Sequence, residues 1–403
     1  MTILLLGGAG AMAEIIARDL LECNIDHLIL ADRDIGLLQQ RAKKLQSSRK
    51  KTRLELRIMD IKSPHLAEQL KKTKADVLIN ATWYMLNTVV MDAAIKARMN
   101  YLDLGGLYWK TKEQLKQKKK AKAAGTMCLL GMGETPGAMN VLAKYGGMLL
   151  DRIERVDMRC GAVVVEKVKN QQWFPPYAIQ TLMDEVTKQP AVLRNGKIVF
   201  PQPLAEYIQF DLSKPIGKSI GYYTLHSELA TLPAYFKNKG VKTMDFAYAY
   251  DQQTLDVITA LDKVQMTSKT PIKVNDVSVS PYQFLGLVDK YLIPRPKRDV
   301  CDVESIRTVL YGTRKGKKMR VTIDLVAKYH KRWQKSAGSV ATGVPASIVA
   351  QWIASGKLHT SGVWTPEDVI DPFPFFKELS KQGRGMAVYL QIGNGARRKL
   401  IVN

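Results

Sequence analysis

A glycine-rich segment near the start of the chain has the residue types and spacing that can bind a phosphate group. Gly8, Gly10 and Ala13 form the pattern G-x-G-x-x-A directly after an apolar run at residues 2–6. In this pattern the first glycine permits a tight turn, the second lets the backbone approach a pyrophosphate, and the alanine keeps the next helix close to the sheet. The amide groups at the N-terminus of that helix favour an anion.

An acidic residue stands at the expected end of a second strand. Residues 27–31 form another apolar run, and Asp32 follows it. Strand, glycine turn, helix, strand and acid in this order are typical of a βαβ unit that binds a dinucleotide. A carboxylate there accepts hydrogen bonds from both ribose hydroxyls and repels a 2′-phosphate, so the sequence favours NAD. Arg33 keeps NADP as the alternative, because it would pair with a 2′-phosphate if Asp32 turned away.

The elements that position these residues continue the same alternation. Strand-like runs at residues 54–59, 75–79, 101–104 and 127–130 are separated by helical stretches, which predicts a doubly wound parallel sheet. Ligands of such sheets bind beyond the carboxyl ends of the strands. The cofactor contacts that we expect there, together with those of the glycine turn, are Gly8, Ala9, Gly10, Ala11, Met12, Asp32, Arg33, Asp60, Ile61, Asn80, Ala81, Thr82 and Gly105.

The pattern of the chain changes after about residue 152. Alternating apolar residues predict strands at 153–165, 244–250 and 308–326, the last interrupted at 314–317, and Asn195-Gly196 indicates a hairpin. Helical patterns lie near 177–187, 253–261, 281–291 and 346–354. The chain is therefore predicted to be an α/β protein, with an N-terminal Rossmann-like sheet and an inserted α+β domain whose sheet is mixed or antiparallel.

The composition limits the other classes of protein. A chain of 403 residues favours two domains, and it contains no apolar run long enough to span a bilayer and no signal peptide at its start. The four cysteines are scattered and have no zinc-site spacing. We therefore expect a cytoplasmic protein with reduced cysteines, no metal and no membrane partner.

The net charge of +24 suggests nucleic-acid binding at first sight. However, the basic residues occur in separate runs at 49–51, 110–122 and 314–318, on a predicted helix face and a predicted hairpin tip. No aromatic residues are interleaved with them, as a platform for single strands would require. We therefore expect no nucleic-acid partner.

Several segments resemble the saccharopine dehydrogenase family, in its lysine 6-dehydrogenase-like branch. They are Gly8-Ala9-Gly10, residues 79–84, residues 101–106, Pro136-Gly137 with Asn140, and residues 341–383, which include Trp364-Thr365-Pro366-Glu367. The segments follow one another in order over nearly the whole chain.

The resemblance implies a Rossmann domain at residues 1–135, completed by residues 336–403, with a substrate and dimerisation domain at 136–335. It also implies a homodimer that transfers a hydride between NAD(P) and a C–N bond of a lysine-derived amino acid, through an imine. Two positions depart from relatives: Asp92 stands where some carry a lysine, and Thr135 stands directly before Pro136, where saccharopine reductases carry an aspartate.

Hydride removal from an amine needs a neutral nitrogen, and hence a base or a desolvated pocket. The catalytic candidates placed at strand ends or outside the Rossmann half are Tyr84, Asp103, Glu134 and His226. Packing is the structural alternative for Tyr84, and capping of a loop or helix is the alternative for Asp103 and for His226 with Glu228. The expected substrate contacts are Gly106, Thr135, Asn140, Trp173 and Glu228.

Two other functions stay open at this stage. The departures from the family pattern are compatible with a dinucleotide-binding sensor or scaffold without turnover. A polyamine-type dehydrogenase, similar to carboxynorspermidine enzymes, would share the fold and the cofactor but use a different amine.

Overall fold

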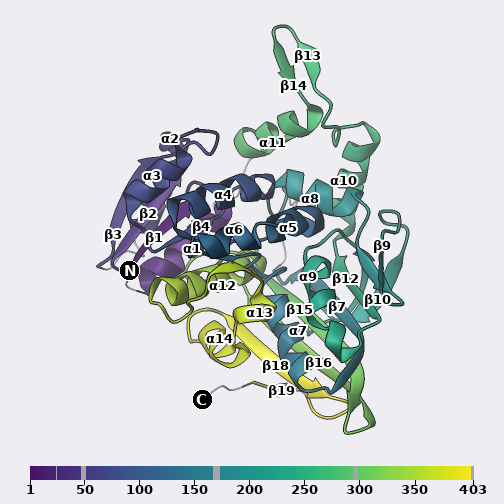
Figure 1. Cartoon of the computed structure of the whole chain (residues 1–403). Helices are drawn as coiled ribbons and strands as arrows, with labels where there is room; N and C mark the ends of the chain where they lie inside the picture. Colours follow the sequence, from purple (N-terminus) through teal and green to yellow (C-terminus); the bar gives the residue numbers. More distant parts are fainter. Residues whose placement is uncertain (24, 47–50, 167–172, 294–297, 401–403) are drawn as a thin grey trace.

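The computed structural model describes residues 1–23, 25–46, 51–166, 173–293 and 298–400. Its N-terminal part contains a seven-stranded parallel sheet in the order β17–β6–β5–β4–β1–β2–β3 (Figure 1). The strands are β1 (Thr2–Leu6), β2 (His27–Asp32), β3 (Arg53–Ile58), β4 (Val77–Asn80), β5 (Asn100–Asp103), β6 (Met127–Leu129) and β17 (Gly362–Trp364). The central strands are buried, as their continuous apolar sequences predict.

Helices cover both faces of this sheet because successive strand residues point to opposite sides. Ile3 and Leu5 of β1 pack in the core that contains α1 and α12, whereas Leu4 and Leu6 pack in the core that contains α3 and α4. The helices of this part are α1 (Ala11–Glu22), α2 (Ile35–Leu45), α3 (Leu66–Thr73), α4 (Asn87–Ala97), α5 (Leu107–Leu115), α6 (Lys118–Ala123) and α12 (Ala337–Ala354).

The second sheet has ten strands and is mixed. Its main path runs β10–β11–β12–β7–β15–β16–β18–β19, while β8 pairs with β12 and β9 pairs with β8. Only the β12–β7 pair is parallel along this path. The strands are β7 (Arg152–Val164), β8 (Val192–Arg194), β9 (Lys197–Val199), β10 (Tyr207–Asp211), β11 (Lys218–Tyr223), β12 (Thr243–Ala249), β15 (Asp302–Arg314), β16 (Lys317–Lys328), β18 (Met386–Ile392) and β19 (Arg398–Lys399). The predicted fold class is confirmed.

The helices that pack around the second sheet are short. They are α7 (Ala138–Met148), α8 (Ile179–Thr187), α9 (Glu228–Tyr235), α10 (Gln252–Lys263), α13 (Pro366–Val369) and α14 (Pro372–Leu379). Helix α7 lies directly on β15, where a Cβ at Gly146 would come within 2.3 Å of Leu310. Among the described residues, no helix is long and apolar enough to cross a membrane.

The segment 336–403 is divided between the two sheets. Strand β17 joins the parallel sheet, whereas β18 and β19 extend the ten-stranded sheet beside β16. Helix α12 begins at Ala337, nine residues before the predicted start at 346, and Pro345 lies inside it. The helix continues through the proline because it is apolar on nearly all sides and is buried between the two sheets, so tertiary packing outweighs the lost hydrogen bond.

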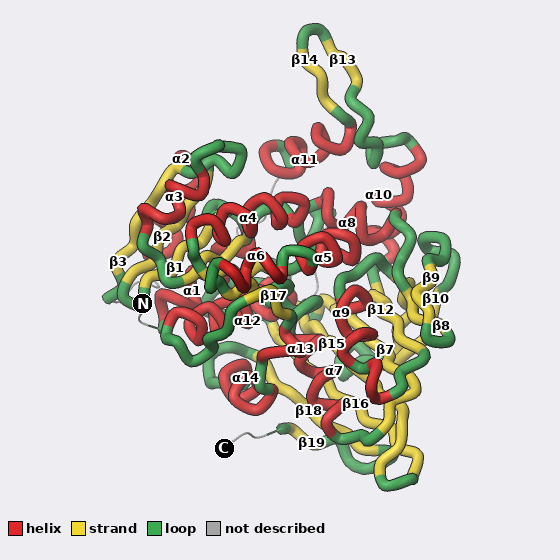
Figure 2. Tube along the Cα trace, in the orientation of Figure 1, coloured by secondary structure: helices red, strands yellow, loops and turns green. Residues whose placement is uncertain are grey.

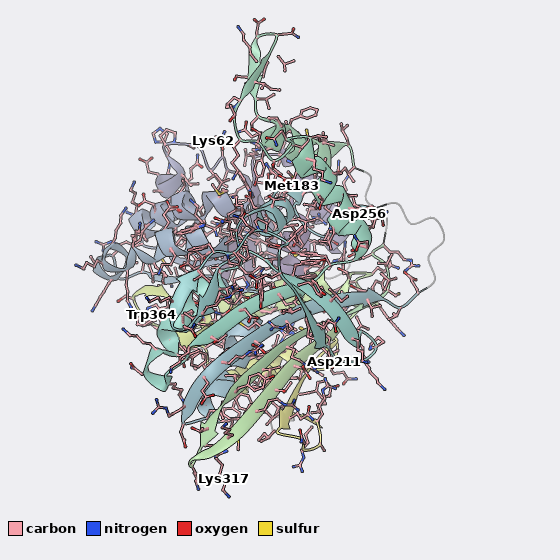
Figure 3. The ribbon with its side chains drawn as sticks, turned by 90° about the vertical axis from the view of Figure 1, so that its right-hand side faces the viewer. Lys62, Met183, Asp211, Asp256, Lys317 and Trp364 are labelled. Carbon is pink, nitrogen blue, oxygen red and sulfur yellow. The ribbon has the colours of Figure 1, made fainter. Side chains whose placement is uncertain are left out.

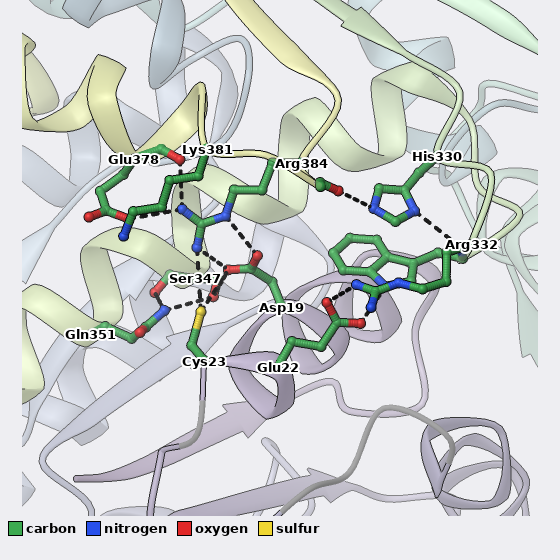
Figure 4. A network of polar contacts seen from close by, with 12 residues as sticks. Asp19, Glu22, Cys23, His330, Arg332, Ser347, Gln351, Glu378, Lys381 and Arg384 are labelled. Carbon is green, nitrogen blue, oxygen red and sulfur yellow. Dashed lines mark hydrogen bonds and ion pairs between the residues drawn. The ribbon is translucent and has the colours of Figure 1, made fainter. Parts of the chain in front are cut away.

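A network of buried polar contacts ties α1 to the C-terminal segment (Figure 4). Asp19 of α1 accepts two hydrogen bonds of 2.9 Å from Arg384 and one of 2.7 Å from Ser347 of α12. Nearby, Trp333 donates to Glu22 at 2.7 Å. The N-terminal βαβ unit is thereby joined to residues more than three hundred positions later in the chain.

A hairpin projects from the body of the protein at the end opposite the β15–β16 turn. It consists of β13 (Ile272–Val274) and β14 (Val277–Val279), and it is followed by α11 (Pro281–Tyr291) (Figures 1 and 2). Lys317, at the β15–β16 turn, lies at the other extremity of the molecule (Figure 3). The sequence prediction included α11 but not this hairpin.

Candidate active site

The glycine-rich turn has the predicted βα geometry, but its glycines have different roles from those expected. Gly7, outside the predicted pattern, has the positive φ of +80°, and a Cβ there would come within 2.8 Å of the carbonyl oxygen of Ala81. Gly8 packs against β2, where a Cβ would lie 3.1 Å from Leu30. Gly10 is the N-cap of α1, with a Cβ position 3.1 Å from the Gly7 carbonyl oxygen. The tight turn therefore depends on Gly7, and Gly8 allows close packing.

The carboxylate of Asp32 lies against this turn. It accepts hydrogen bonds from the backbone amides of Ala9 at 3.3 Å and Asp34 at 3.2 Å. Arg33 beside it is exposed. Arg41 of α2 is half-buried, donates to the Ala9 carbonyl at 3.1 Å, and has its pKa lowered to about 10 by the loss of solvent. Acidic and basic groups thus meet at the end of β2 where the ribose of a dinucleotide binds.

The N-terminus of α1 is suited to a pyrophosphate. Gly10 has no side chain with which to cap the helix, so the amides of Ala11 and Met12 stay available to a ligand. The one acid in this turn, Glu14, is buried and forms ion pairs with Arg18 at 3.0 Å, Arg41, and Lys335 at 3.4 Å. The three cations compensate the negative charge of Glu14, so its carboxylate does not repel the phosphates of a bound dinucleotide. The residues present therefore fit a dinucleotide.

The other predicted cofactor residues stand at the ends of β3, β4 and β5. Asn80 is 1% exposed, and its side chain is engaged by Asn87, Tyr101 and Thr82. These bonds position the loop of Ala81 and Thr82, and the contact of Asn80 with the cofactor stays a prediction. Asp60 is exposed and accepts from Lys62, and Ile61 packs beside it against the apolar core of that face.

Asp103 is completely buried and serves the loops of the site. Its carboxylate accepts four hydrogen bonds, from Tyr101 at 2.8 Å, Gln114 at 2.7 Å, and the amides of Gly105 at 2.9 Å and Gly131 at 2.7 Å. These bonds fasten the ends of β5 and β6 to each other. These contacts agree with the capping alternative for Asp103, and its catalytic role stays a prediction.

Tyr84 is directed toward the second domain. Its hydroxyl donates to Asp184 of α8, which also accepts from Tyr282 at 2.6 Å and pairs with Lys188 at 2.8 Å. Burial raises the pKa of Tyr84, and the neighbouring Asp184 raises it further. Burial also raises the pKa of Asp184, but hydrogen bonds from Lys188 and the two tyrosines outweigh this and lower it overall. Tyr84 is thus a donor that links the domains.

The predicted substrate residues are not all brought together. Asn140 is buried, accepts from the Gly137 amide at 3.0 Å and donates to Glu367 at 2.9 Å, so it joins α7 to the C-terminal segment, and its contact with the substrate stays a prediction. Trp173 donates to Thr254 at 3.1 Å within an apolar cluster, which agrees with core packing.

Gly106 lines a cavity at the end of β5. The cavity has a volume of about 210 Å³ and is bordered by Tyr84, Met85, Gly106, Leu107, Trp109, Lys110, Glu113, Lys188 and Leu225. Thr135 is half-buried in the loop after β6, next to the fully enclosed Pro136. A Cβ at Gly105 would come within 2.7 Å of Pro136 and 3.7 Å of Ser227, so α9 begins against the end of β5.

His226 and Glu228 belong to a buried acidic cluster. Nδ1 of His226 lies 2.6 Å from Glu228 and its Nε2 lies 3.8 Å from Glu185 of α8, while the ring stacks on Phe246 at 4.1 Å. Burial lowers the pKa of His226, but Glu228 and Glu185 outweigh it, so the pKa is raised overall. The side chains do not cap α9, whose N-cap is Ser227 and has no side-chain hydrogen bond.

Two tyrosines complete the cluster around Glu185. The hydroxyls of Tyr177 and Tyr250 both donate to this carboxylate, the second at 3.2 Å. Burial raises the pKa of Glu185, and the opposing effect of His226 is smaller. One oxygen of Glu228 is buried with no hydrogen-bond partner among the described residues. This oxygen of Glu228 can therefore accept a hydrogen bond from a ligand.

Glu134 occupies a second buried group next to the first. It is 5% exposed, in the turn after β6, and it hydrogen-bonds to Glu304 of β15. Glu304 in turn accepts from Tyr248 at 3.1 Å and from Cys160 at 3.5 Å. Burial raises the pKa of Glu134, and the negative charges of Glu304 and Asp302 raise it further. The turn after β6 thus holds a carboxyl group whose neutral form is favoured, and its catalytic role stays a prediction.

One face of β12 connects the two groups. Phe246, Tyr248 and Tyr250 alternate along the chain, so their rings stand on the same side. The rings of Tyr248 and Tyr250 stack at 4.3 Å, with one hydroxyl on Glu304 and the other on Glu185. The second sheet therefore supplies a surface of three aromatic rings next to the carboxyl ends of the parallel strands. We call the rings of Phe246, Tyr248 and Tyr250 the aromatic floor.

The sequence prediction missed several members of this site: Cys160, Glu185, Tyr248, Tyr250 and Glu304. The alternating aromatic residues of 246–250 were a usable indication, because three rings on one face need a partner surface. Glu134, Cys160 and Glu304 also place three potential ligand atoms within 4.8 Å of one another. The hydrogen bonds to Glu304 account for this spacing, and we assign no metal there.

Comparisons with known proteins agree with this architecture. Residues 3–129 match the family described as Saccharopine dehydrogenase NADP binding domain, and residues 133–384 match Saccharopine dehydrogenase C-terminal domain. The chain is 25% identical to a carboxyaminopropylagmatine dehydrogenase of Synechocystis sp., covering 93% of this chain and 94% of the relative. It is also 25% identical to a carboxynorspermidine synthase of Vibrio alginolyticus, with the same coverage of both chains.

Solved structures share the fold at lower identity. The apo saccharopine dehydrogenase (L-Glu forming) of Saccharomyces cerevisiae is 16% identical, with a TM-score of 0.72 over 98% of this chain and 100% of that one. The homospermidine synthase of Legionella pneumophila in complex with NAD is 14% identical, with a TM-score of 0.65 over 97% of this chain and 91% of that one. The chain therefore belongs to the saccharopine dehydrogenase family and is an oxidoreductase with that family's nucleotide-binding domain.

Proposed function

We propose that the protein reduces the C=N bond of an imine to a secondary amine, and in reverse oxidises that amine. The secondary amine joins a carboxylate-bearing chain to a polyamine-like amine. The observation that carries this proposal is the excess of buried acid at the site. Glu134, Glu185, Glu228 and Glu304 lie on or beside the aromatic floor, and within the described residues His226 is the single side chain that pairs with any of them as a cation. Buried carboxylates need a cationic partner, which a polyamine supplies.

The contrast with Asp184 supports this interpretation. Asp184 precedes Glu185 in α8 but is paired with Lys188 at 2.8 Å and Lys269 at 3.5 Å. Its charge is therefore already compensated by the protein. Lys188 also borders the cavity at Gly106, together with Lys110. Lys110 pairs with Glu113 of the same cavity at 2.6 Å, so both lysines already have an acidic partner. We infer that the glutamates of the buried cluster receive the amines of the substrate.

The names of the relatives point the same way. Carboxyaminopropylagmatine and carboxynorspermidine both combine a carboxyl group with an amine of more than one nitrogen. A lysine-derived substrate such as saccharopine, favoured by the resemblance, carries the two carboxylates of its glutarate half in addition to that of its lysine half. The buried glutamates beside the aromatic floor therefore favour a polyamine-type substrate over a lysine-derived one.

The residues of the chain assist the chemistry on both sides of the hydride step. The nicotinamide supplies or accepts the hydride when it is bound. Glu134, kept neutral by burial and by Glu304, is suited to protonate the hydroxyl of a carbinolamine so that water leaves and the iminium forms. Glu185 and Glu228 hold the distant ammonium group. The turn at residues 7–10, Asp32 and the amides of α1 hold the dinucleotide, and NAD is the form that Asp32 favours.

Turnover with defined pairs of substrates tests the proposal. The purified protein is supplied with NADH or NADPH, a short α-amino-acid aldehyde, and a diamine or agmatine, and cofactor oxidation is followed by absorbance. Lysine and saccharopine with the oxidised cofactors form the comparison set. We expect turnover with the amine–aldehyde pairs and a large increase in amine KM for Glu228→Gln. Turnover with lysine or saccharopine alone would contradict the polyamine assignment, and cofactor binding without any turnover would favour the sensor.

The state of the cysteines bears on the cellular compartment of the protein. All four cysteines are free, although Cys128 and Cys160 are buried and Cys23 and Cys301 are not. Free thiols of both kinds fit a reducing compartment, and we propose the cytoplasm.

A further inference from the structure

The two carboxyl groups of Glu134 and Glu304 are in unequal surroundings. Both residues are 5% exposed, and an oxygen of each lies within 4.8 Å of the other, so two negative charges there would repel each other. One oxygen of Glu134 has no hydrogen-bond partner among the described residues. Glu304, by contrast, accepts from the hydroxyl of Tyr248 at 3.1 Å and from the thiol of Cys160 at 3.5 Å. Donors to a carboxylate stabilise its charged form, so they favour the anion at Glu304.

The start of α12 adds to this difference. A Cβ at Gly338, in the first turn of α12, would lie only 2.0 Å from Oε2 of Glu304, so the carboxylate touches the helix at a residue without a side chain. Helix α12 has eighteen residues, and its N-terminus carries the positive end of the helix dipole. Asp302 also uses this terminus, by accepting from the amide of Ala337 at 2.7 Å.

We propose that Glu304 is a positioning residue, which takes the negative charge of the pair and thereby keeps Glu134 protonated as the acid of the C–N step. This inference rests on the function proposed above. Glu134 transfers its proton to the hydroxyl of a neutral carbinolamine, the C–O bond breaks, water leaves, and the nitrogen lone pair forms the C=N⁺ bond. The products are water, an iminium cation and the Glu134 carboxylate, so that charge and atoms balance.

The pair would then favour the iminium over the preceding neutral species. Two adjacent carboxylates repel each other, and that repulsion is relieved while a cation lies beside them. The titratable groups that face Glu134 are Glu304 and Asp302 of β15, Cys160 of β7 and Tyr248 of β12. None of them is cationic, so the substrate is the cation that the pair receives.

Infrared difference spectroscopy tests the proton without any substrate. The wild type should show the carbonyl band of a protonated carboxyl group above pH 7 that is missing from Glu134→Gln. In Glu304→Gln this band should disappear at lower pH, because the neighbouring negative charge is gone. Gly338→Ala, whose new methyl group displaces the Glu304 carboxylate, should shift the band in the same direction and serves if Glu304→Gln does not fold. Glu367→Gln removes another buried carboxyl group, and this band should remain unchanged in it.

The pH profile of turnover then tests the role in the reaction. Activity that needs protonated Glu134 falls as pH rises through its pKa, so the ratio of kcat at pH 8 to kcat at pH 6 should drop about tenfold in Glu304→Gln. A loss that is equal at both pH values would indicate a merely structural role and overturn the inference. A band that titrates as in wild type, or one equivalent of tightly bound metal in the purified protein, would also overturn it. If no amine is turned over, the proposed function is wrong. The infrared measurement still shows whether Glu134 carries the proton and Glu304 the negative charge.

Discussion

The side-chain amide of Asn140 donates a 2.9 Å hydrogen bond to Glu367, which lies 227 residues later in the chain. Asn140 is the third residue of α7 and also caps that helix through the amide of Gly137. Glu367 is completely buried in the first turn of α13. Two separate segments that carry the family resemblance therefore hold each other in place.

The protonation of Glu367 should make stability depend on pH. Burial raises its pKa from 4.5 to about 7, with smaller opposing effects from Thr231 and Asn140. The folded state therefore holds the proton more tightly than the unfolded state, and this stabilisation is present below pH 4.5 and is lost as pH rises through 7. Relative to wild type, Glu367→Gln should gain up to about 3 kcal/mol of unfolding free energy between pH 4.5 and pH 8.

Urea denaturation of both proteins at pH 5 and pH 8 measures this difference. Asp302, whose pKa is raised to about 7 mainly by burial, contributes equally to both proteins and cancels. A stability difference that is the same at the two pH values would show that Glu367 does not titrate in this range.

The buried pair of Asp19 and Arg384 should be essential for stability (Figure 4). Their side chains are 5% and 9% exposed, and Arg384 spans the carboxylate with two 2.9 Å bonds. Replacing Asp19 by Ala leaves an uncompensated buried guanidinium, which costs about 3–5 kcal/mol. The matched control is Lys381→Ala, which removes an exposed pair with Glu378 and should cost at most about 1 kcal/mol. Equal losses in the two variants would contradict the prediction.

Asp32 should determine the choice of cofactor. Asp32→Ser removes acceptors for the ribose hydroxyls and a like charge against a 2′-phosphate, so NAD affinity should fall by about 1–3 kcal/mol and relative use of NADP should rise. Calorimetric titration with each dinucleotide measures both effects. Arg33→Ala is the matched control and should lower NADP binding in the Asp32→Ser background. A wild type that already prefers NADP would make Arg33 the deciding residue.

The projecting hairpin should mediate a homodimer. Ile272, Val274 and Val277 are 54%, 53% and 64% exposed, and an isolated two-stranded hairpin is at best marginally stable in water. We expect the wild type to be a dimer and Val274→Asp/Val277→Asp to be a monomer in sedimentation experiments. Ile220→Asp changes a residue of β11 that is 53% exposed and should remain dimeric. A monomeric wild type would contradict this prediction.

The local part of the fold was predictable from the sequence. The order of β1, glycine turn, α1, β2 and Asp32 was predicted correctly, as was the hairpin at Asn195-Gly196, where both residues have positive φ. These features follow from side-chain size, strand alternation and backbone freedom over a few residues. The mistakes were also local in origin: the helix that contains Pro345 was expected to begin at residue 346, and the tight turn was assigned to Gly8 and not to Gly7.

The amino-acid sequence by itself determined the dinucleotide-binding unit, the two sheets and the presence of titratable residues at strand ends. Only the tertiary structure decided which of those residues act together. Asp103 and Asn80 turned out to be satisfied within their loops, whereas Glu134 met Glu304, and His226 met Glu185. Such pairs depend on the order and register of distant strands, which are set by burial of whole sheet faces, and no local pattern records them.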